Sequence, residues 1–438
     1  MTVVFVSVLV TVVAPLALLA ALSLLRAAIA RPPERLVAGL VEGAFGLTAA
    51  ACVVAATSVV VAPEPTLELA LGEWFRVASD AVQLTFAIDR LSLGFGALAA
   101  TLLVLVARLS RTYLHRERGY FRYFFLLSVL GAGVTATCFA GSLDLLIFGW
   151  ELVGVASALL IAFFHERPSA ARHGLMTFSI YRVCDVGLLV ALAWLHHAEG
   201  GARFVVESAG VRALGAPASP FDAHLVAAGL VLAAVGKAAQ FPVSGWLPRA
   251  MEGPTPSSAI FYGALSIHLG PVLLLRARPL FEATPSVSVA IVIVGLLTAA
   301  YGKLVGRVQT DAKARLAYAS MTQVGFIFAE IGLGLEALAM LHILGHATLR
   351  SYELLRAPSV IRDRRGAPEA RGFFAWLDGT DVGRRIHRFA IERAYVEPFV
   401  LRKARKLGEF LREVDRRDAA YIERLERGAE SKAVREAR

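Results

Sequence analysis

The sequence predicts an all-α protein, a polytopic bundle of about eleven membrane-spanning helices with a broken helix near Lys237 and an amphipathic helical tail. Three observations predict this class. Hydrophobic residues make up 57% of the 438 residues, charged residues only 18%, and the mean hydropathy is +0.61. Apolar runs of about 20 residues recur, which is the length that crosses a bilayer as a helix. The short alternating segments typical of an outer-membrane barrel are absent from the sequence.

The expected spans follow one another along most of the chain, with boundaries good to a few residues. The first is predicted to be an uncleaved span and not a signal peptide, because it lacks a positive start and its apolar run is too long. In the seventh range Pro242 breaks the helix after Lys237 and frees backbone groups that can bind water. The ranges are residues 3–25, 37–62, 91–108, 122–141, 143–164, 173–196, 224–247, 257–276, 286–306, 314–334 and 337–358.

The loops between these spans differ in charge from one side to the other. The loops at residues 31–35, 108–122, 165–173, 248–256 and 302–315 contain most of the loop lysine and arginine. The loops at 63–89 and 200–222 belong to the opposite side. By the positive-inside rule, the protein is expected in the cell inner (plasma) membrane, with its N-terminus outside and its C-terminal tail in the cytoplasm.

The chain divides into a predicted transmembrane domain at residues 1–360 and a cytoplasmic basic tail at 361–438. The tail holds 20 Lys/Arg and 14 Asp/Glu, which is six of the ten net positive charges. It is expected near anionic lipid or an acidic partner protein, and nucleic acid is excluded as a partner. Its apolar residues recur at helical spacing and predict amphipathic helices, with a solvated helical tail as the alternative. They are Ile386, Phe389, Leu407, Phe410, Leu411, Val414, Ile422 and Leu425.

The sequence contains no motif for a cofactor or an enzymatic active site. The three cysteines lie in separate apolar segments, without the spacing or the histidines of a zinc or iron–sulfur site. Phosphate-binding glycine loops and GxSxG motifs are also absent. We therefore expect no bound cofactor, no metal and no catalytic residue in this chain.

Four ionisable residues lie inside apolar segments between residues 148 and 237: Glu151, Arg182, Asp185 and Lys237. Each costs at least a few kcal/mol at membrane depth, so such residues usually face a protein interior or a water-filled cavity. Arg182 and Asp185 are three residues apart, on one helix face. A buried lysine can exchange its proton near neutral pH, and a neighbouring acid biases that exchange. This arrangement is the basic device of a proton pump.

A second polar set follows in the later spans. His342, His346 and Arg350 are spaced four residues apart and form one stripe on a helix. Histidine relays protons near neutral pH, whereas a metal site would need a third ligand nearby. The alternative interpretation of all these residues is that they form structural ion pairs. This alternative is preferred for Lys303, Asp311 and Lys313, which are closest to the cytoplasmic loop. The remaining members of the set are His268, Lys303, Asp311, Lys313, Glu330 and Glu353.

The ordered motifs between residues 85 and 350 resemble the antiporter-like proton-channel subunits of respiratory complex I, a family shared with Mrp antiporters and membrane-bound hydrogenases. The resemblance is closest to the largest, distal complex I subunit. The motifs are DRLS at 89–92, GWELVG at 149–154, YRVCD at 181–185, GKAAQFP at 236–242, WLPRAMEGPTPSSA at 246–259, QTDAKARLAYASMTQVG at 309–325 and HILGH at 342–346.

The resemblance implies a role for each polar residue. Glu151 matches the glutamate that couples neighbouring channel units, and Lys237 matches the central proton-carrying lysine. Arg182 and Asp185 match the charged pair that tunes the glutamate. His342 and His346, the two histidines of the HILGH motif, match the connecting histidines.

The chain departs from the family pattern at three places. The histidine expected soon after the PTP motif is Tyr262, with His268 about two turns further on. Arg350 stands where the family usually has a lysine, and arginine stays protonated. The family's second broken helix and exit lysine are expected after residue 358, where the sequence has no apolar span. The proton path is therefore expected to end at Arg350 or to be completed by a partner.

The resemblance implies a proton-translocating subunit of a complex-I-related assembly, one part of an NADH:quinone oxidoreductase-like translocase. Its expected partners are protons, the lipid bilayer and other subunits of a membrane complex. Two alternatives stay open from the shortened pattern. One is the membrane subunit of a proton-driven inorganic carbon uptake complex with a soluble zinc protein as partner. The other is a scaffold subunit that does not conduct.

Overall fold

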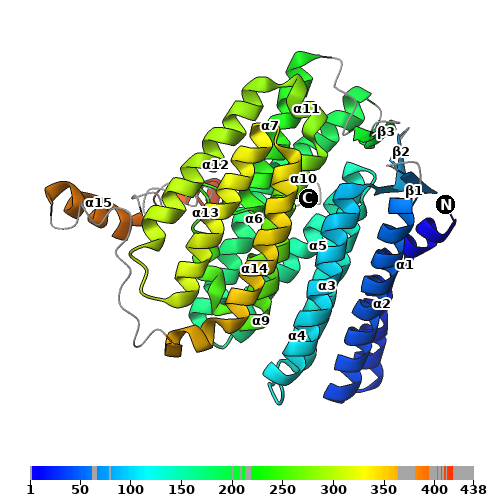
Figure 1. Cartoon of the computed structure of the whole chain (residues 1–438), viewed down its shortest axis with the longest axis horizontal. Coiled ribbons are helices and arrows are strands. Elements are labelled where there is room, and N and C mark those ends of the chain that lie inside the picture. The colour runs from blue at the N-terminus through cyan, green and yellow to red at the C-terminus, as the bar shows by residue number, and fades with distance from the viewer. Residues whose placement is uncertain are drawn as a thin grey trace, which may run out of the picture. The chain divides into compact units, whose positions relative to one another are not determined.

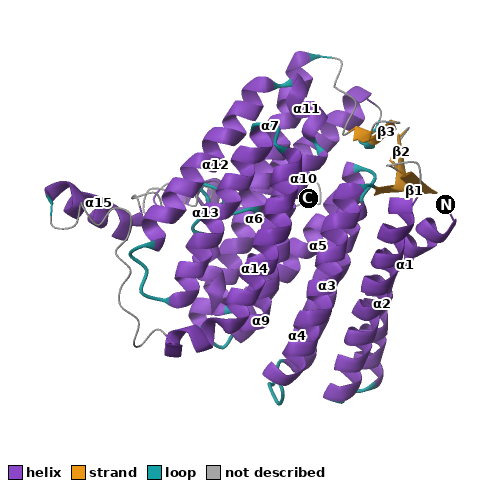
Figure 2. Cartoon of the chain, in the orientation of Figure 1, coloured by secondary structure: helices purple, strands orange, loops and turns teal. Residues whose placement is uncertain are grey.

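The computed structural model describes two compact units, Met1–Glu369 and Ala370–Arg438. The first is a bundle of long helices with two short β-hairpins near one end of the helices (Figures 1 and 2). The residues described are 2–61, 67–77, 80–199, 201–207, 210–212, 219–363, 380–393, 402, 406, 409–410 and 412–417.

The expected spans fall on a helix or on a run of consecutive helical segments, except the range 224–247, in which α7 ends at Lys237 and irregular backbone follows. Within the described residues, nine helices are long and apolar enough to cross a membrane: α1 to α7, the run from α9 to α10, and α12. The all-α polytopic prediction is confirmed. The last two expected spans fall on α13 and α14, and the count of eleven stays a prediction. The bounds of the helices in the first unit are α1 Thr2–Ala28, α2 Glu34–Val61, α3 Arg90–Tyr113, α4 Tyr120–Phe139, α5 Leu143–Ile161, α6 Pro168–Glu199, α7 Pro220–Lys237, α8 Trp246–Arg249, α9 Thr255–Ser258, α10 Leu265–Arg276, α11 Arg278–Ala283, α12 Pro285–Gly306, α13 Ala312–Gly332 and α14 Glu336–Asp363.

Two antiparallel hairpins occupy loops in which the sequence had not indicated strands. Strand β1 (Leu67–Val77) pairs with β2 (Asp80–Ile88), and β3 (Val205–Glu207) pairs with β4 (Gly210–Arg212). The backbone N–H of Gly141 donates to the Thr85 carbonyl at 2.8 Å, and the N–H of Phe204 donates to the Gly141 carbonyl at 2.9 Å. These bonds hold the turn between α4 and α5 and therefore fix where α5 begins.

The predicted helix break lies close to Lys237. Helix α7 ends at Lys237 itself, before Pro242, so a single span over 224–247 is corrected to a shorter helix followed by irregular backbone. Ala239 adopts a left-handed backbone conformation, with φ of 51°, which an α-helix of L-residues cannot continue. The freed carbonyl of Gly236 accepts a hydrogen bond from Trp246 Nε1 at 3.1 Å. The break thus puts Lys237 at a helix end with polar backbone around it.

Helices α6 and α7 approach each other through two facing glycines. A Cβ atom on Gly187 would lie 2.5 Å from the Gly229 carbonyl oxygen, and one on Gly229 would lie 2.4 Å from the Gly187 carbonyl oxygen. Small residues that let backbones touch are the usual means of packing helices in lipid, where burial of apolar surface gives little driving force. This contact brings the α6 carboxylate and the α7 lysine of the candidate site together.

The second unit contains the described part of the tail. Helix α15 (Asp381–Ile391) begins at Thr380, whose hydroxyl accepts a hydrogen bond from the Gly383 N–H at 2.9 Å. Three of its exposed apolar side chains, Val382, Ile386 and Phe389, are spaced at three to four residues, as predicted for an amphipathic helix, and a fourth, Ile391, lies at the helix end. Leu407, Leu411, Ile422 and Leu425 of the predicted stripe lie outside the described residues.

The glycine contact predicts opposite effects for one substitution at two sites. Gly229→Ala should destabilise the protein by about 1–3 kcal/mol, because the added methyl group overlaps the Gly187 carbonyl. The matched control is Gly43→Ala in α2, where a Cβ meets nothing within 4 Å. There alanine should be neutral or stabilising by up to about 1 kcal/mol, since it is the better helix former. The midpoint of thermal unfolding in detergent measures both, and equal midpoints would contradict the proposed close packing.

Candidate functional site

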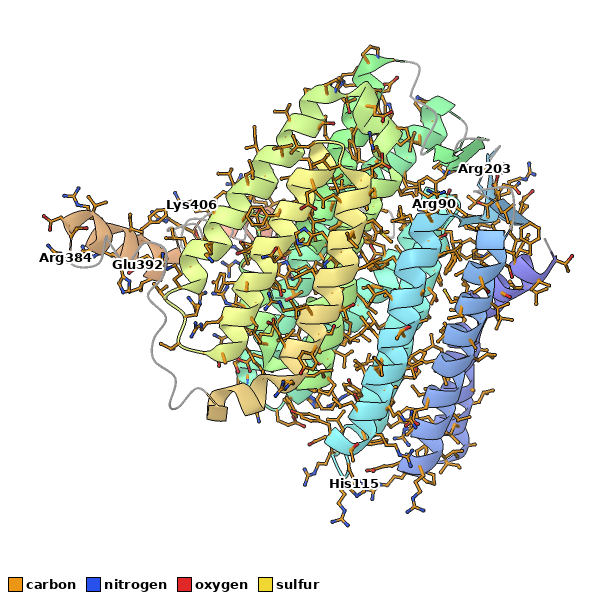
Figure 3. The ribbon with its side chains drawn as sticks, viewed as in Figure 1. Arg90, His115, Arg203, Arg384, Glu392 and Lys406 are labelled. Carbon is orange, nitrogen blue, oxygen red and sulfur yellow. The ribbon has the colours of Figure 1, made fainter. Side chains whose placement is uncertain are left out.

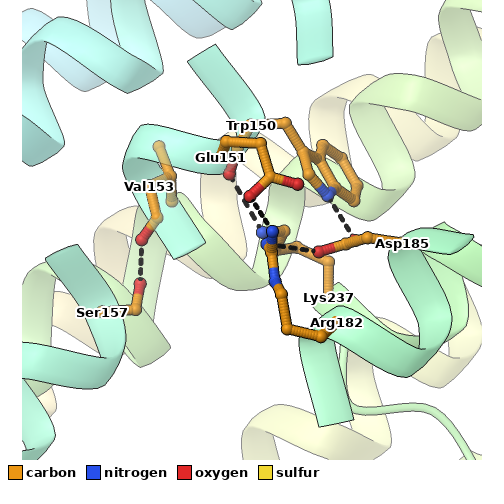
Figure 4. A network of polar contacts seen from close by, with 7 residues as sticks. All are labelled: Trp150, Glu151, Val153, Ser157, Arg182, Asp185 and Lys237. Carbon is orange, nitrogen blue, oxygen red and sulfur yellow. Dashed lines mark hydrogen bonds and ion pairs between the residues drawn. The ribbon is translucent and has the colours of Figure 1, made fainter. Parts of the chain in front are cut away.

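Lys237 lies at the centre of the first polar cluster. It is the last residue of α7 and its side chain is fully buried. The Nζ atom donates a hydrogen bond to the backbone carbonyl of Trp150 at 3.1 Å (Figure 4). It also lies 4.6 Å from the ring centroid of Trp150 and 4.4 Å from that of Tyr181. Two aromatic faces and one carbonyl therefore stabilise the ammonium, with no carboxylate in direct contact among the described residues.

The carboxylates lie one step further out and are joined by Arg182. Its Nη1 atom forms an ion pair with Glu151, and its Nη2 atom donates to Asp185 Oδ2 at 2.8 Å (Figure 4). The second oxygen of Asp185 accepts a bond from Trp150 Nε1 at 2.6 Å. Trp150 thus contacts Lys237 through its carbonyl and Asp185 through its indole, and it links the three helices α5, α6 and α7.

The cluster is sheltered on one side and open on the other. The side chain of Asp185 is 3% exposed, whereas those of Glu151 and Arg182 are 28% and 35% exposed. Gly154 on α5 makes the close approach possible, because a Cβ there would lie 3.1 Å from Lys237 Nζ and 3.4 Å from Arg182 Nη2. The arrangement couples a buried amine to a carboxylate that reaches the surface of the chain.

A pair of buried histidines forms the core of the second cluster. His268 on α10 and His346 on α14 are hydrogen-bonded, with His268 Nε2 and His346 Nδ1 3.0 Å apart. His268 Nδ1 also contacts the Ala264 carbonyl, which can only accept, so this nitrogen carries the hydrogen. In the neutral pair, His346 Nδ1 then donates to His268 Nε2. The remaining nitrogen, His346 Nε2, is buried without a partner among the described residues and is the basic atom of the pair.

His342 extends this cluster toward α13. Its Nδ1 atom lies 2.9 Å from Glu330 Oε1, and its Nε2 atom lies 3.1 Å from Gln323 Oε1. Two oxygen acceptors suit a doubly protonated ring. If the Gln323 amide turns over, its NH₂ group suits the neutral ring equally well. The rings of His342 and His346 have centroids 6.3 Å apart, so the three histidines form one continuous group.

The other residues predicted for the site differ in their surroundings. Arg350 is 7% exposed and pairs with Glu353, with Nη1 and Oε2 2.7 Å apart. Asp311 accepts a bond from the Ala314 N–H at 2.7 Å and caps α13. Lys313 donates to Thr255 Oγ1 at 2.9 Å. Asp311 and Lys313 therefore fit the structural reading.

No direct hydrogen bond joins the two clusters within the described part of the chain. Buried hydroxyl groups lie in the region between them. Tyr181 faces Lys237, and Ser157 donates to Ser266, two residues before His268, at 3.4 Å. The hydroxyls of Tyr181 and Tyr262 are buried without a hydrogen-bond partner among the described residues, so each can bind water. Sequence reasoning missed Trp150, Tyr181 and Gln323, although the GWELVG and YRVCD motifs already contained the first two.

The structure is that of a multi-pass helical membrane protein that buries amine, carboxylate and imidazole groups. The comparison with known families identifies one matching family. Residues 140–374, more than half of the chain, match the family described as NADH:quinone oxidoreductase/Mrp antiporter, TM. The chain belongs to this family, and the resemblance noted in the sequence is confirmed.

Individual relatives are named as subunits of quinone oxidoreductases. The chain is 32% identical to NADH-quinone oxidoreductase subunit L of Rhodobacter capsulatus over 341 residues, which cover 75% of this chain and 48% of the relative. It is 34% identical to the chloroplastic NAD(P)H-quinone oxidoreductase subunit 5 of Anthoceros angustus, covering 66% of this chain and 40% of the relative. The chain thus spans about half the length, or less, of these curated relatives.

Two solved structures share the fold. The Mrp complex of Dietzia sp. DQ12-45-1b contains a chain with a TM-score of 0.67 at 23% identity, covering 89% of this chain and 42% of that one. The archaeal membrane-bound sulfane sulfur reductase contains a chain with a TM-score of 0.68 at 19% identity, covering 81% and 71%. At these identities the likeness concerns the fold alone.

The burial difference between the two carboxylates predicts unequal costs of neutralising them. Asp185→Asn should destabilise the protein by about 3 kcal/mol, because it removes a buried charge from Arg182. Glu151→Gln should cost about 1 kcal/mol or less, since Glu151 is more exposed. Thermal unfolding in detergent measures the loss of stability in both variants. A larger loss for Glu151→Gln than for Asp185→Asn would contradict the assignment of Asp185 as the more strongly buried partner of Arg182.

Proposed function

We propose that this chain is a proton-translocating subunit of a membrane complex and that Lys237 is its central proton carrier. The observation that supports this most is the fully buried amine, which is separated from Glu151 and Asp185 by Arg182 and Trp150. A permanently charged structural lysine would be expected to contact a carboxylate directly. Here the charge balance around the amine depends on where Arg182 lies.

The coupling follows from simple electrostatics. While Arg182 pairs with Glu151 and Asp185, its single positive charge offsets one of their two negative charges, so the amine gains less from the carboxylates and can release its proton more easily. When the Arg182–Glu151 pair opens, the carboxylates attract positive charge and favour proton uptake by Lys237. Because Glu151 is partly exposed, an event at the surface of the chain can open that pair. Opening of the Arg182–Glu151 pair at the surface would in this way raise the proton affinity of Lys237.

A proton released by Lys237 has an acceptor in the histidine group. Hydroxyls of Tyr181, Ser266 and Tyr262, with bound water, would carry it toward His268. His346 Nε2 accepts it, and His342 then takes it up as a doubly protonated ring, to which Gln323 presents its amide oxygen. Glu330 stabilises the charged ring of His342. Arg350 keeps a fixed positive charge at the end of the stripe and stops the proton from going further along α14.

The relatives suggest the setting in which this happens. They are subunits of quinone oxidoreductases, and the fold neighbours belong to multisubunit membrane complexes. We propose that this chain likewise works with other membrane subunits, in an inner membrane, with its N-terminus outside and its tail in the cytoplasm. A soluble zinc partner stays a prediction from the shortened motif pattern. Mass spectrometry of the complex purified in mild detergent identifies the companions.

The central-lysine assignment predicts that Lys237→Ala abolishes potential-driven proton flux while assembly remains intact. The complex is reconstituted into liposomes, a potassium diffusion potential is applied, and an internal dye reports pH. Lys303→Ala is the matched control, because Lys303 is an exposed lysine on α12. It should leave the flux unchanged. Flux that persists in an assembled Lys237→Ala complex would refute the assignment.

The fixed charge at the end of the histidine stripe gives a second test. Arg350→Lys keeps the positive charge next to Glu353 and adds a group that can release a proton. The variant should assemble and retain proton flux in the same liposome assay. An assembled Arg350→Lys complex without flux would show that the guanidinium itself is required, and the proposed role of Arg350 as a mere fixed charge would then be wrong.

A further inference from the structure

A histidine–aspartate pair lies where α6 ends and α5 begins, at the ends of these helices that are opposite to the predicted cytoplasmic loops. His196 Nε2 and Asp144 Oδ1 are 2.9 Å apart, and the side chains are 19% and 12% exposed. The pair is therefore sheltered but reachable by water. The β1–β2 hairpin contacts this end of the bundle, and Figure 3 shows Arg203 beside the strands, whereas His115 lies at the far end of the helices. Neither member of the pair has a part in the mechanism above.

Each member of this pair lies at a helix end. Asp144 lies in the first turn of α5, where the helix dipole stabilises an anion. His196 lies in the last turn of α6, where the dipole stabilises a cation. Each group therefore lies where the helix dipole complements the charge that its side chain can carry.

The pair shares a helix face with Glu151. Asp144, Phe148 and Glu151 lie at positions i, i+4 and i+7 of α5, and all three are partly exposed. Seven residues correspond to about 10 Å along the helix axis. Phe148 lies between the two acids, and its ring meets that of Trp74 on β1 edge to face, with centroids 5.7 Å apart. Two proton-binding groups are thus separated by one aromatic barrier.

We propose that Asp144 and His196 form a proton-binding station that serves Glu151 from the side of the membrane where the β1–β2 hairpin lies, with Phe148 and Trp74 as the barrier between them. The inference rests on the proposed function, because it gives the Glu151 cluster its access to one aqueous phase. The proton moves from His196 to water and then to Glu151 when the aromatic pair parts.

Other charged groups near the pair are already engaged or face solvent. Asp222 on α7 accepts a bond from Trp194 Nε1 at 2.9 Å. Arg203, which follows α6, donates to Glu68 on β1 at 2.5 Å. His197 is exposed, with its ring 6.2 Å from that of Trp194. None of these contacts competes for Asp144, so His196 is its titratable partner among the described residues.

The test compares variants with opposite expected effects in the liposome assay. His196→Phe and Asp144→Asn should lower proton flux about tenfold or more, since a proton-transfer group contributes at least that much. They should also flatten the dependence of flux on the pH of the compartment facing the hairpin. Phe148→Ala, one turn from Asp144, should raise the flux because it opens the barrier. Trp194→Phe is the matched control: it breaks a neighbouring hydrogen bond without removing a titratable group, and flux should not change.

Several outcomes would overturn the proposal. One is an assembled His196→Phe complex whose flux and pH dependence equal those of the wild type. Another is a loss of flux in the Phe148→Ala complex. If the wild-type complex shows no flux at all, the proposed function fails instead. The station is then tested on the same sample by ¹⁵N NMR of labelled histidine, with His196→Phe assigning the signal. A His196 signal that titrates between pH 5 and 9 supports the station, and one that does not titrate refutes it.

Discussion

The hydrogen bond from Lys237 Nζ to the Trp150 carbonyl is the contact around which the first polar cluster is built. It requires a helix that ends at the lysine, so that the amine reaches α5, and an α5 backbone without side chains in the way. The break after α7 meets the first condition, and Gly154 meets the second. The same tryptophan fixes Asp185 through its indole. One residue therefore sets the position of an amine and a carboxylate that do not touch each other.

This separation matters because of the low dielectric of the bundle. A lysine and an aspartate in direct contact would form a stable pair that neither gains nor loses a proton easily. With an indole and a guanidinium between them, the carboxylate acts on the amine at a distance, and its effect changes when Arg182 moves. An irregular π-helical turn at Ala259–Ala264 lies next to the second cluster, and the Ala264 carbonyl at its end contacts His268 Nδ1 and orients the ring.

Sequence reasoning predicted the fold class and the broken helix well, because long apolar runs and an internal proline have few alternative structures in a bilayer. It identified Glu151, Arg182, Asp185 and Lys237 as a group, since each is costly at membrane depth. It did not reveal the strands, which lie in loops where no periodic pattern was seen. Nor did it reveal that His268 contacts His346, because residues 78 positions apart meet only through the packing of α10 and α14. Trp150 was overlooked since an aromatic residue in an apolar span carries no signal of its own.

The unequal exposure of the polar residues bears on how the chain works with its surroundings. Lys237, His268 and His346 are buried within the chain and need no other protein to shield them from lipid. Glu151 and Arg182 reach its surface at membrane depth, where contact with acyl chains would be costly. They must face water or a neighbouring subunit. In the proposed mechanism the pairing of this partly exposed carboxylate controls the buried amine, so a neighbouring subunit on this surface would be placed to act on Lys237.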